Sequence, residues 1–143
     1  MKPKNIKKYS LILMLCAVCL LSLSACKGGI SGDEAKATVN EFFEAVVNEN
    51  YEEANALLHP DRYTDSSEFF LSIEEESGLD FQQGIEIVKY SGFSSSYYNS
   101  EVGGSRYELT MQVKIGESDM SFSVEIVKNG NGYGIYNLHL ESI

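Results

Sequence analysis

Two histidines stand close to carboxylates in this chain, and such pairs could carry out acid–base or metal chemistry. His59 begins a His-Pro-Asp tripeptide, and His139 lies two residues before Glu141. The two pairs are far apart in the sequence and match no metal-binding spacing, so we expect neither a metal site nor another cofactor. Pro60 also gives the tripeptide a structural explanation, because proline disfavours helical geometry in the preceding residue and would end a helix near His59.

Tyrosines are the other side chains suited to recognition, since each offers a large contact area and one hydroxyl group. The segment from Phe93 to Ser100 reads Phe-Ser-Ser-Ser-Tyr-Tyr-Asn-Ser, a composition typical of adaptable binding surfaces. The alternative is an ordinary solvent-facing strand followed by its turn. The candidates for a ligand pocket or binding surface are His59, Tyr63, Tyr97, Tyr98, Tyr107 and Tyr136.

The first 26 residues have the parts of a bacterial export signal. Four lysines precede an uncharged apolar run, Leu11–Leu21, which is too short to span a bilayer. Soon after it comes Leu23-Ser24-Ala25-Cys26, which resembles the lipobox of bacterial lipoproteins. The resemblance implies that residues 1–25 are a cleaved lipoprotein signal peptide and that Cys26 is acylated, with palmitate or a similar fatty acid. The alternatives are a plain secretory signal with an incidental cysteine, or a short uncleaved anchor.

Removal of this leader would change the charge of the chain. Four of the 11 basic residues would leave while all 21 acidic residues remain, so the formal charge would become −14 instead of −10. Such a charge repels phosphate backbones and argues against nucleic acid as a partner. Residues 26–32, the acylated cysteine and a glycine-rich stretch, would form a short tether. Residues 33–143 would form a single domain on the extracytoplasmic face of a bacterial membrane.

Helical periodicity comes first in this domain. Apolar residues recur at helical spacing from Ala35 to Val47, after a Ser-x-x-Glu capping signature that begins at Ser31. A short helix near residues 51–58 and a third helix between Asp65 and Gly78 are expected next. From residue 84 the pattern alternates, which predicts strands at about 85–99, 106–115, 120–126 and 133–141. The fold class is therefore α+β, with N-terminal helices packed on a curved four-stranded antiparallel meander.

That order of elements resembles the nuclear transport factor 2-like superfamily, which has the cystatin-like cone fold. The resemblance rests on Phe42-Phe43, on the stretch from Tyr51 to Asp61 and on the closing stretch from Gly132 to Leu138. It implies a cone whose enzymatic members place polar catalytic residues on the inner face of the strands. Here the inward positions of the two clearest strands are apolar apart from Tyr107, so we expect a filled core.

We therefore expect a membrane-tethered, extracytoplasmic and noncatalytic domain for binding or protein interaction. Its partner would be an envelope protein, a peptide or a small apolar ligand, and the chain would be a monomer or a weak dimer. The alternative is a small-substrate enzyme of the same cone fold, of the isomerase, dehydratase or hydrolase kind, that uses tyrosines with His59 or His139. Convergence of those side chains in one cavity would favour the enzyme.

Overall fold

The computed structural model describes residues 29–62, 65–97 and 102–143. Within them, three α-helices come first, α2 (Gly32–Val47), α3 (Tyr51–Ala56) and α4 (Ser66–Ser77), followed by the short 3-10 helix η2 (Phe81–Gln83). The four strands that follow are β1 (Ile85–Tyr97), β2 (Ser105–Ile115), β3 (Ser118–Asn129) and β4 (Gly132–Ser142). They form one antiparallel sheet in the order β1-β2-β3-β4, so the predicted α+β meander is confirmed.

The helices begin where the sequence predicts. The Ser31 hydroxyl accepts a hydrogen bond from the Glu34 N–H at 3.2 Å at the start of α2, which satisfies one of the free amides of its first turn. The Asp65 carboxylate accepts one from the Ser67 N–H at 2.8 Å at the start of α4. The helix η2 was not part of the sequence-based prediction. It leads the chain from α4 into β1 and buries Phe81, which is 1% exposed.

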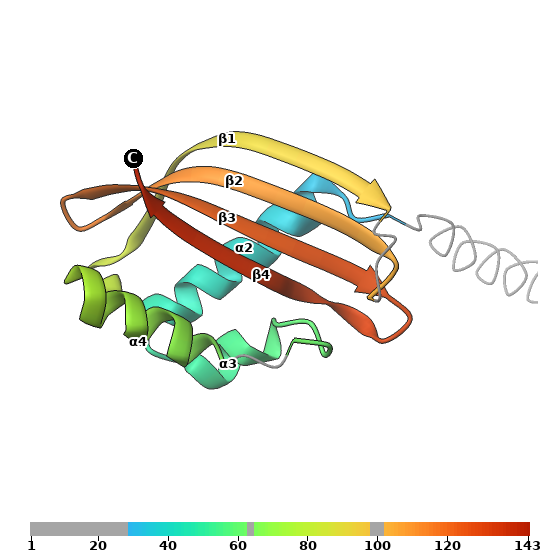
Figure 1. Ribbon diagram of the computed structural model, residues 1–143, viewed down its shortest axis with the longest axis horizontal. Helices are drawn as coiled ribbons and strands as arrows, with labels where there is room; N and C mark the ends of the chain where they lie inside the picture. The colour runs from blue at the N-terminus through green and yellow to red at the C-terminus, as the bar shows by residue number, and fades with distance from the viewer. Residues whose placement is uncertain (1–28, 63–64, 98–101) are drawn as a thin grey trace, which may run out of the picture.

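The core lies between α2 and the inner face of the sheet (Figure 1). The predicted inward residues are buried on β2 (Tyr107, Leu109, Met111, Val113 and Ile115) and on β3 (Phe122, Val124 and Ile126), so the expected filled core is confirmed at these positions. The Phe70 ring of α4 lies 5.8 Å from the ring of Phe42, 4.8 Å from that of Phe81 and 6.3 Å from that of Phe122. Burial of each ring contributes about 1.5–3 kcal/mol to folding.

The two edge strands of the sheet, β4 and β1, differ in whether another segment pairs with them. Part of β4 is covered, because the His59 N–H donates to the Ile135 carbonyl at 2.8 Å and the Ile135 N–H donates to the Leu57 carbonyl at 2.9 Å. Strand β1 has no such cover among the described residues, and its pairing with β2 shifts register between Ile87 and Lys89 and between Tyr90 and Gly92. These two β-bulges twist this edge of the sheet, and Gly92 lies at the second of them.

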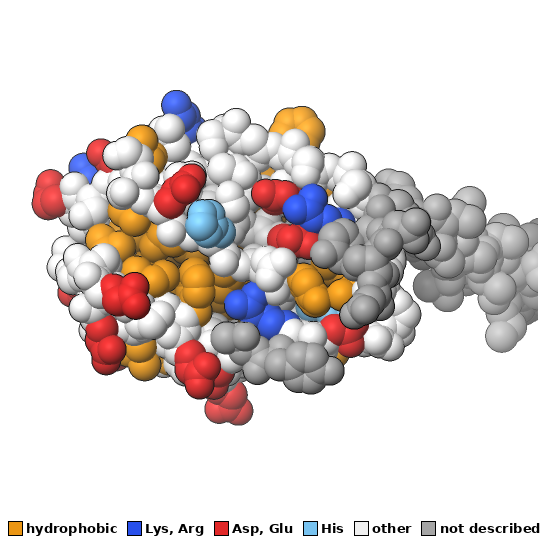
Figure 2. Space-filling view, in the orientation of Figure 1, with side chains coloured by type: hydrophobic (Ala, Val, Ile, Leu, Met, Phe, Trp, Pro, Cys, Tyr) orange, Lys and Arg blue, Asp and Glu red, His pale blue; other side chains and the backbone are white. Residues whose placement is uncertain are grey.

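Figure 2 shows the outer face of the sheet, with acidic side chains around its margins and apolar side chains exposed between the sheet and the helices. In the described ranges, no helix is long and apolar enough to cross a membrane. The predicted signal peptide and Cys26 lie outside the described residues. Ile30 of the predicted tether is buried in the core cluster, so the chain is held against the domain from that residue onward.

Candidate functional site

A groove of about 650 Å³ opens between the N-terminal half of α2 and β1. Pockets that hold small molecules usually measure about 300–1,000 Å³. The groove is therefore large enough for a small ligand or a short stretch of peptide. Its lining combines aromatic, small and basic residues: Lys36, Tyr90, Ser91, Gly92, Phe93, Tyr107 and Leu109.

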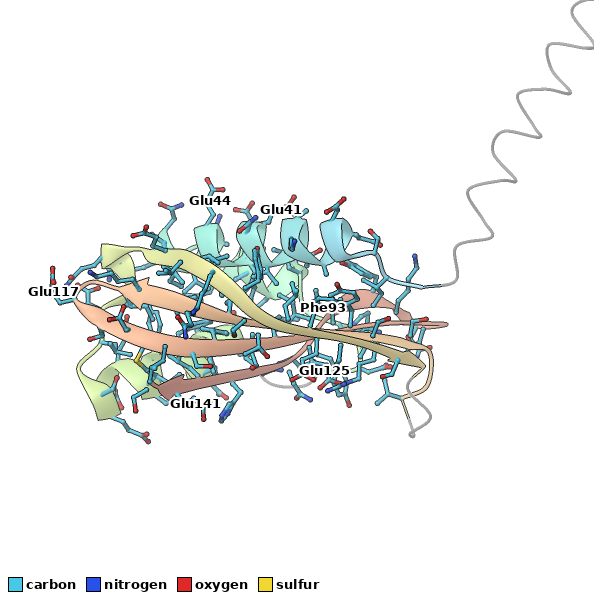
Figure 3. The ribbon with its side chains drawn as sticks, turned by 90° about the horizontal axis from the view of Figure 1, so that it is seen from above. Glu41, Glu44, Phe93, Glu117, Glu125 and Glu141 are labelled. Carbon is cyan, nitrogen blue, oxygen red and sulfur yellow. The ribbon has the colours of Figure 1, made fainter. Side chains whose placement is uncertain are left out.

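Phe93 is the most exposed aromatic residue of this groove. Its cross-strand partner is Leu109, which is 1% exposed, and directly paired residues share a face of the sheet. Phe93 is nevertheless 78% exposed, since no described side chain covers it. Figure 3 shows Phe93 on the side of the sheet where α2 lies, with Glu125 on the opposite side. An uncovered aromatic ring on the core face of a sheet is a surface that a ligand or partner can bury.

Lys36 gives the groove its positive charge. Its ammonium group lies 4.7 Å from the centroid of the Tyr90 ring, a cation–π contact that holds the charge above the aromatic surface. Burial raises the pKa of the Tyr90 hydroxyl above its ordinary value of 10.0. Among the described residues, no carboxylate lies within ion-pair distance of Lys36. The cation is therefore available to an anionic group of a ligand.

Tyr107, one of the predicted pocket residues, lines the groove and is 9% exposed. A β-carbon added to Gly32 would lie only 2.8 Å from the Tyr107 hydroxyl oxygen. The first residue of α2 therefore passes directly beside this tyrosine, and glycine is the residue that allows the approach. The chain that comes from the predicted tether thus reaches the domain at the groove.

His59, another predicted pocket residue, lies away from the groove and is 1% exposed. Its Nδ1 accepts a hydrogen bond from the Asp61 N–H at 3.1 Å, and its Nε2 lies 3.2 Å from the Gly132 carbonyl oxygen. With Nδ1 as the acceptor, Nε2 is the ring nitrogen that donates, toward the Gly132 carbonyl. The His-Pro-Asp tripeptide is therefore structural: through the buried His59 ring it connects the end of α3 to the β3–β4 hairpin.

Of the remaining predicted site residues, Tyr136 is described by the structure and does not line the groove. The Tyr136 ring packs edge-on against His59 at a centroid distance of 6.0 Å, and Arg62 donates a hydrogen bond to the Tyr136 carbonyl. Tyr63 and Tyr98 lie outside the described residues, and so does the side chain of Tyr97.

The two histidines of the enzymatic alternative do not lie together. The His139 side chain is 69% exposed and pairs only with Glu141, at 3.5 Å, among the described residues. His59 instead bonds to Gly132, seven residues earlier on β4, which is about 23 Å along an extended strand. No group of three or more metal-ligating side chains occurs in the part of the chain that the structure describes.

A buried ion cluster on the outer sheet face was missed by sequence reasoning. Glu125 is 9% exposed, its Oε1 lies 3.0 Å from Arg106 Nε, and its Oε2 accepts a hydrogen bond from the Asn137 amide at 3.1 Å. Arg106 also pairs with Glu108 at 2.5 Å. Burial lowers the pKa of Arg106, but its hydrogen bonds and attraction to the two carboxylates outweigh that effect and raise it. The Arg106–Glu125 ion pair links β2 to β3, and the Asn137 hydrogen bond links β3 to β4.

Sequence reasoning also missed Lys36 and Tyr90 as groove residues. A signal was available for Tyr90, because the apolar residues from Ile85 to Phe93 depart from strict alternation, as they do at β-bulges. No local signal marked Lys36, whose role depends on where α2 crosses β1. No protein-family model matches this chain, and the comparison with curated proteins finds no similar sequence.

Proposed function

We propose that this chain is an extracytoplasmic bacterial lipoprotein, anchored through Cys26, whose folded domain is a noncatalytic binding module. The groove between α2 and β1 is its binding site, and the 78% exposure of Phe93 on the core face of the sheet is the observation that carries this assignment. The order of helices and meander supports a relation to the cone-fold superfamily, whose members include noncatalytic binding domains.

The lipobox and the short segment behind it support the anchor. Ile30 comes four residues after Cys26, so the two can be at most about 14 Å apart when the chain is fully extended. Because Ile30 is buried in the domain, the groove beside Gly32 would stay close to the membrane surface. Two acyl chains would suffice for stable anchoring, since each buried CH₂ contributes about 0.8 kcal/mol.

The chemistry of the groove favours an amphipathic ligand with an apolar or aromatic body and one anionic group. Phe93, Tyr107 and Leu109 offer apolar surface, and Lys36 offers a single cation. The domain is strongly acidic overall, but charges more than a Debye length away, about 8–10 Å, are largely screened at physiological salt. Attraction to Lys36 should therefore outweigh the repulsion from distant carboxylates.

Fluorescence titration with anilinonaphthalene sulfonate tests the groove, because this probe joins aromatic rings to one sulfonate. We expect residues 27–143, which contain every described element and the whole core, to bind it with saturation. Phe93→Ser and Lys36→Gln should each weaken binding at least about fivefold, a difference of about 1 kcal/mol. The matched control is Leu71→Ser, which removes a 48% exposed apolar side chain on α4. Equal weakening by all three variants would contradict the groove as the site.

Metabolic labelling with an alkyne analogue of palmitate tests the anchor. The full chain expressed in a bacterium should incorporate the label and fractionate with membranes. Cys26→Ser should abolish both, while Cys19→Ser, within the predicted signal, should leave both intact. A labelled Cys26→Ser variant, or an unlabelled wild-type chain, would overturn the proposed lipidation.

A further inference from the structure

The second half of β1 is an uncharged and regular strand edge. The first half carries the features that usually keep free edges from pairing, namely the charges of Glu86 and Lys89 and two β-bulges. From Phe93 to Tyr97 there is no charge, no proline and no register shift. The three serines at positions 94–96 are exposed, and β1 is the terminal strand of the described sheet. This stretch is therefore open to a further strand.

The same stretch is complementary to itself. It reads aromatic, three serines, aromatic in both directions. Antiparallel pairing of two copies about Ser95 places Ser95 opposite Ser95, Ser94 opposite Ser96, and Phe93 opposite Tyr97 of the second copy. Directly opposed residues share a face of the sheet, so this register pairs an aromatic position with an aromatic position at both ends.

We propose that two copies of this chain associate through the Phe93–Tyr97 edge of β1. The two four-stranded sheets then become one continuous antiparallel sheet of eight strands, related by a two-fold axis at Ser95. The second copy extends the sheet beside the exposed Phe93 ring. The net negative charge of the chain opposes association in general, but none of it lies on these five residues. The pairing concerns the sheet edge and holds whether or not the groove binds a ligand.

The position at which the N-terminal segment enters the domain, at Gly32, is compatible with this two-fold arrangement. A two-fold axis between antiparallel neighbours stands perpendicular to the sheet, so both copies of α2 lie on the same face. Tyr107 is the β2 partner of Ser95, and Gly32 lies beside the Tyr107 hydroxyl. Both chains thus enter their domains near the axis and on one face. If the proposed anchor holds, one membrane can tether both copies, and tethering raises the effective concentration for this short interface.

Site-directed disulfide formation tests the register. The full chain is used in detergent with its own cysteines replaced (Cys16→Ala, Cys19→Ala, Cys26→Ala), so the result does not depend on lipidation. Under mild oxidation, Ser95→Cys should form a disulfide-linked homodimer, because directly opposed Cα atoms lie about 4.5–5.5 Å apart. Ser94→Cys alone and Ser96→Cys alone should remain monomeric, since like positions are then about 7–8 Å apart, while their mixture should cross-link.

A like-charge substitution tests the association without cysteines. In the same background, Ser95→Glu puts two carboxylates face to face at the axis and should raise the dimer dissociation constant at least tenfold, measured by light scattering across a concentration series. Val88→Glu places the same charge at an exposed position in the bulged half of β1 and should leave the constant within twofold.

Three results would overturn the proposal. The first is a Ser95→Cys chain that stays monomeric under oxidation, and the second is cross-linking of Ser94→Cys alone as readily as of Ser95→Cys. The third is a Ser95→Cys chain that, in a whole-membrane extract, cross-links to other proteins but not to itself, which would mean that the edge takes a strand from a different partner. Loss of probe binding in the groove, in contrast, would leave the self-pairing standing.

Discussion

The Nε2 atom of His59 lies 3.0 Å from the Oδ1 atom of Asn129, 70 positions further along the chain. The same oxygen accepts hydrogen bonds from the Asn131 N–H at 2.9 Å and the Gly132 N–H at 3.2 Å. One amide oxygen therefore holds both the β3–β4 turn and the loop that follows α3. This relationship makes the His-Pro-Asp tripeptide part of the scaffold rather than part of the groove.

Asn129→Ala removes this oxygen and leaves the buried Nε2–H of His59 with one acceptor fewer. The Asn131 and Gly132 N–H groups lose the same acceptor, and each lost hydrogen bond costs about 0.5–1.5 kcal/mol. We therefore expect the free energy of unfolding to fall by about 1–3 kcal/mol in urea titrations. Asn40→Ala, at an exposed position of α2, should change it by less than about 0.5 kcal/mol. Equal stabilities of the two variants would show that the network contributes nothing.

Gly134→Ala tests how closely the α3 loop lies against β4. The added β-carbon would lie 2.6 Å from the His59 backbone nitrogen and 2.8 Å from the Leu57 carbonyl oxygen, and backbone atoms cannot give way easily. We expect a loss of about 1–3 kcal/mol or more in the free energy of unfolding. Gly130→Ala, in the neighbouring turn with no atom within 4 Å, is the matched control and should cost little. A tolerated Gly134→Ala would contradict the docking of the loop.

Substitution of two phenylalanines, one in the core and one in the groove, distinguishes the two regions by their effect on stability. Phe70→Ala removes a ring that is fully buried among other aromatic rings and should reduce stability by about 3–5 kcal/mol. Phe93→Ala removes a ring that is 78% exposed and should change stability by less than about 0.5 kcal/mol while weakening probe binding. A large loss of stability with Phe93→Ala would mean that this ring belongs to the core.

Stability should fall in acid partly through Asp61. Hydrogen bonds from the Asn129 and Asn131 side chains lower the pKa of the Asp61 carboxyl below its ordinary value of 3.8. The unfolded chain therefore takes up this proton at a higher pH than the folded chain. The stabilisation is present above about pH 4 and is lost as the pH falls through the lowered pKa.

Urea midpoints measured from about pH 6 down to about pH 3 check this expectation. Asp61→Asn should be less stable than the wild type at neutral pH and should lose less of its remaining stability in acid. Glu117→Gln removes an exposed carboxylate at the β2–β3 turn and controls for the change in net charge (Figure 3). If the urea midpoint of Asp61→Asn falls with pH as steeply as that of the wild type, the loss of stability in acid comes from other carboxyl groups.

Local patterns predicted the elements because each one faces a single core. Strand β2 alternates without a fault between Arg106 and Ile115, so its buried face could be read directly from the sequence. Helix α2 was predictable for the same reason, since its capping serine and its apolar spacing agree. The helix η2 was not, because three residues are too few to show a period.

The groove residues could not be predicted in the same way, because the groove is formed by segments that are distant in the sequence. Hydrophobic periodicity indicates local structure but not contacts between such segments. Phe93 sits at an inward position opposite the buried Leu109, yet it is 78% exposed, and no local pattern shows which inward positions the helices leave uncovered. His59 was a candidate for ligand binding, but the partners that bury it lie on β3 and β4. Glu125 occupies an outward position, and its burial follows from the register that brings Arg106 and Asn137 beside it.

The most direct test of the binding groove is to map the bound probe by NMR on ¹⁵N-labelled residues 27–143. Titration with anilinonaphthalene sulfonate should shift the amide signals of Ser91, Gly92, Phe93 and Tyr107 together, with one common dissociation constant. The amide of Leu71 on α4 should stay in place. Shifts that cluster on α4 or on the outer face of the sheet, with the four groove signals unmoved, would contradict the groove between α2 and β1 as the binding site.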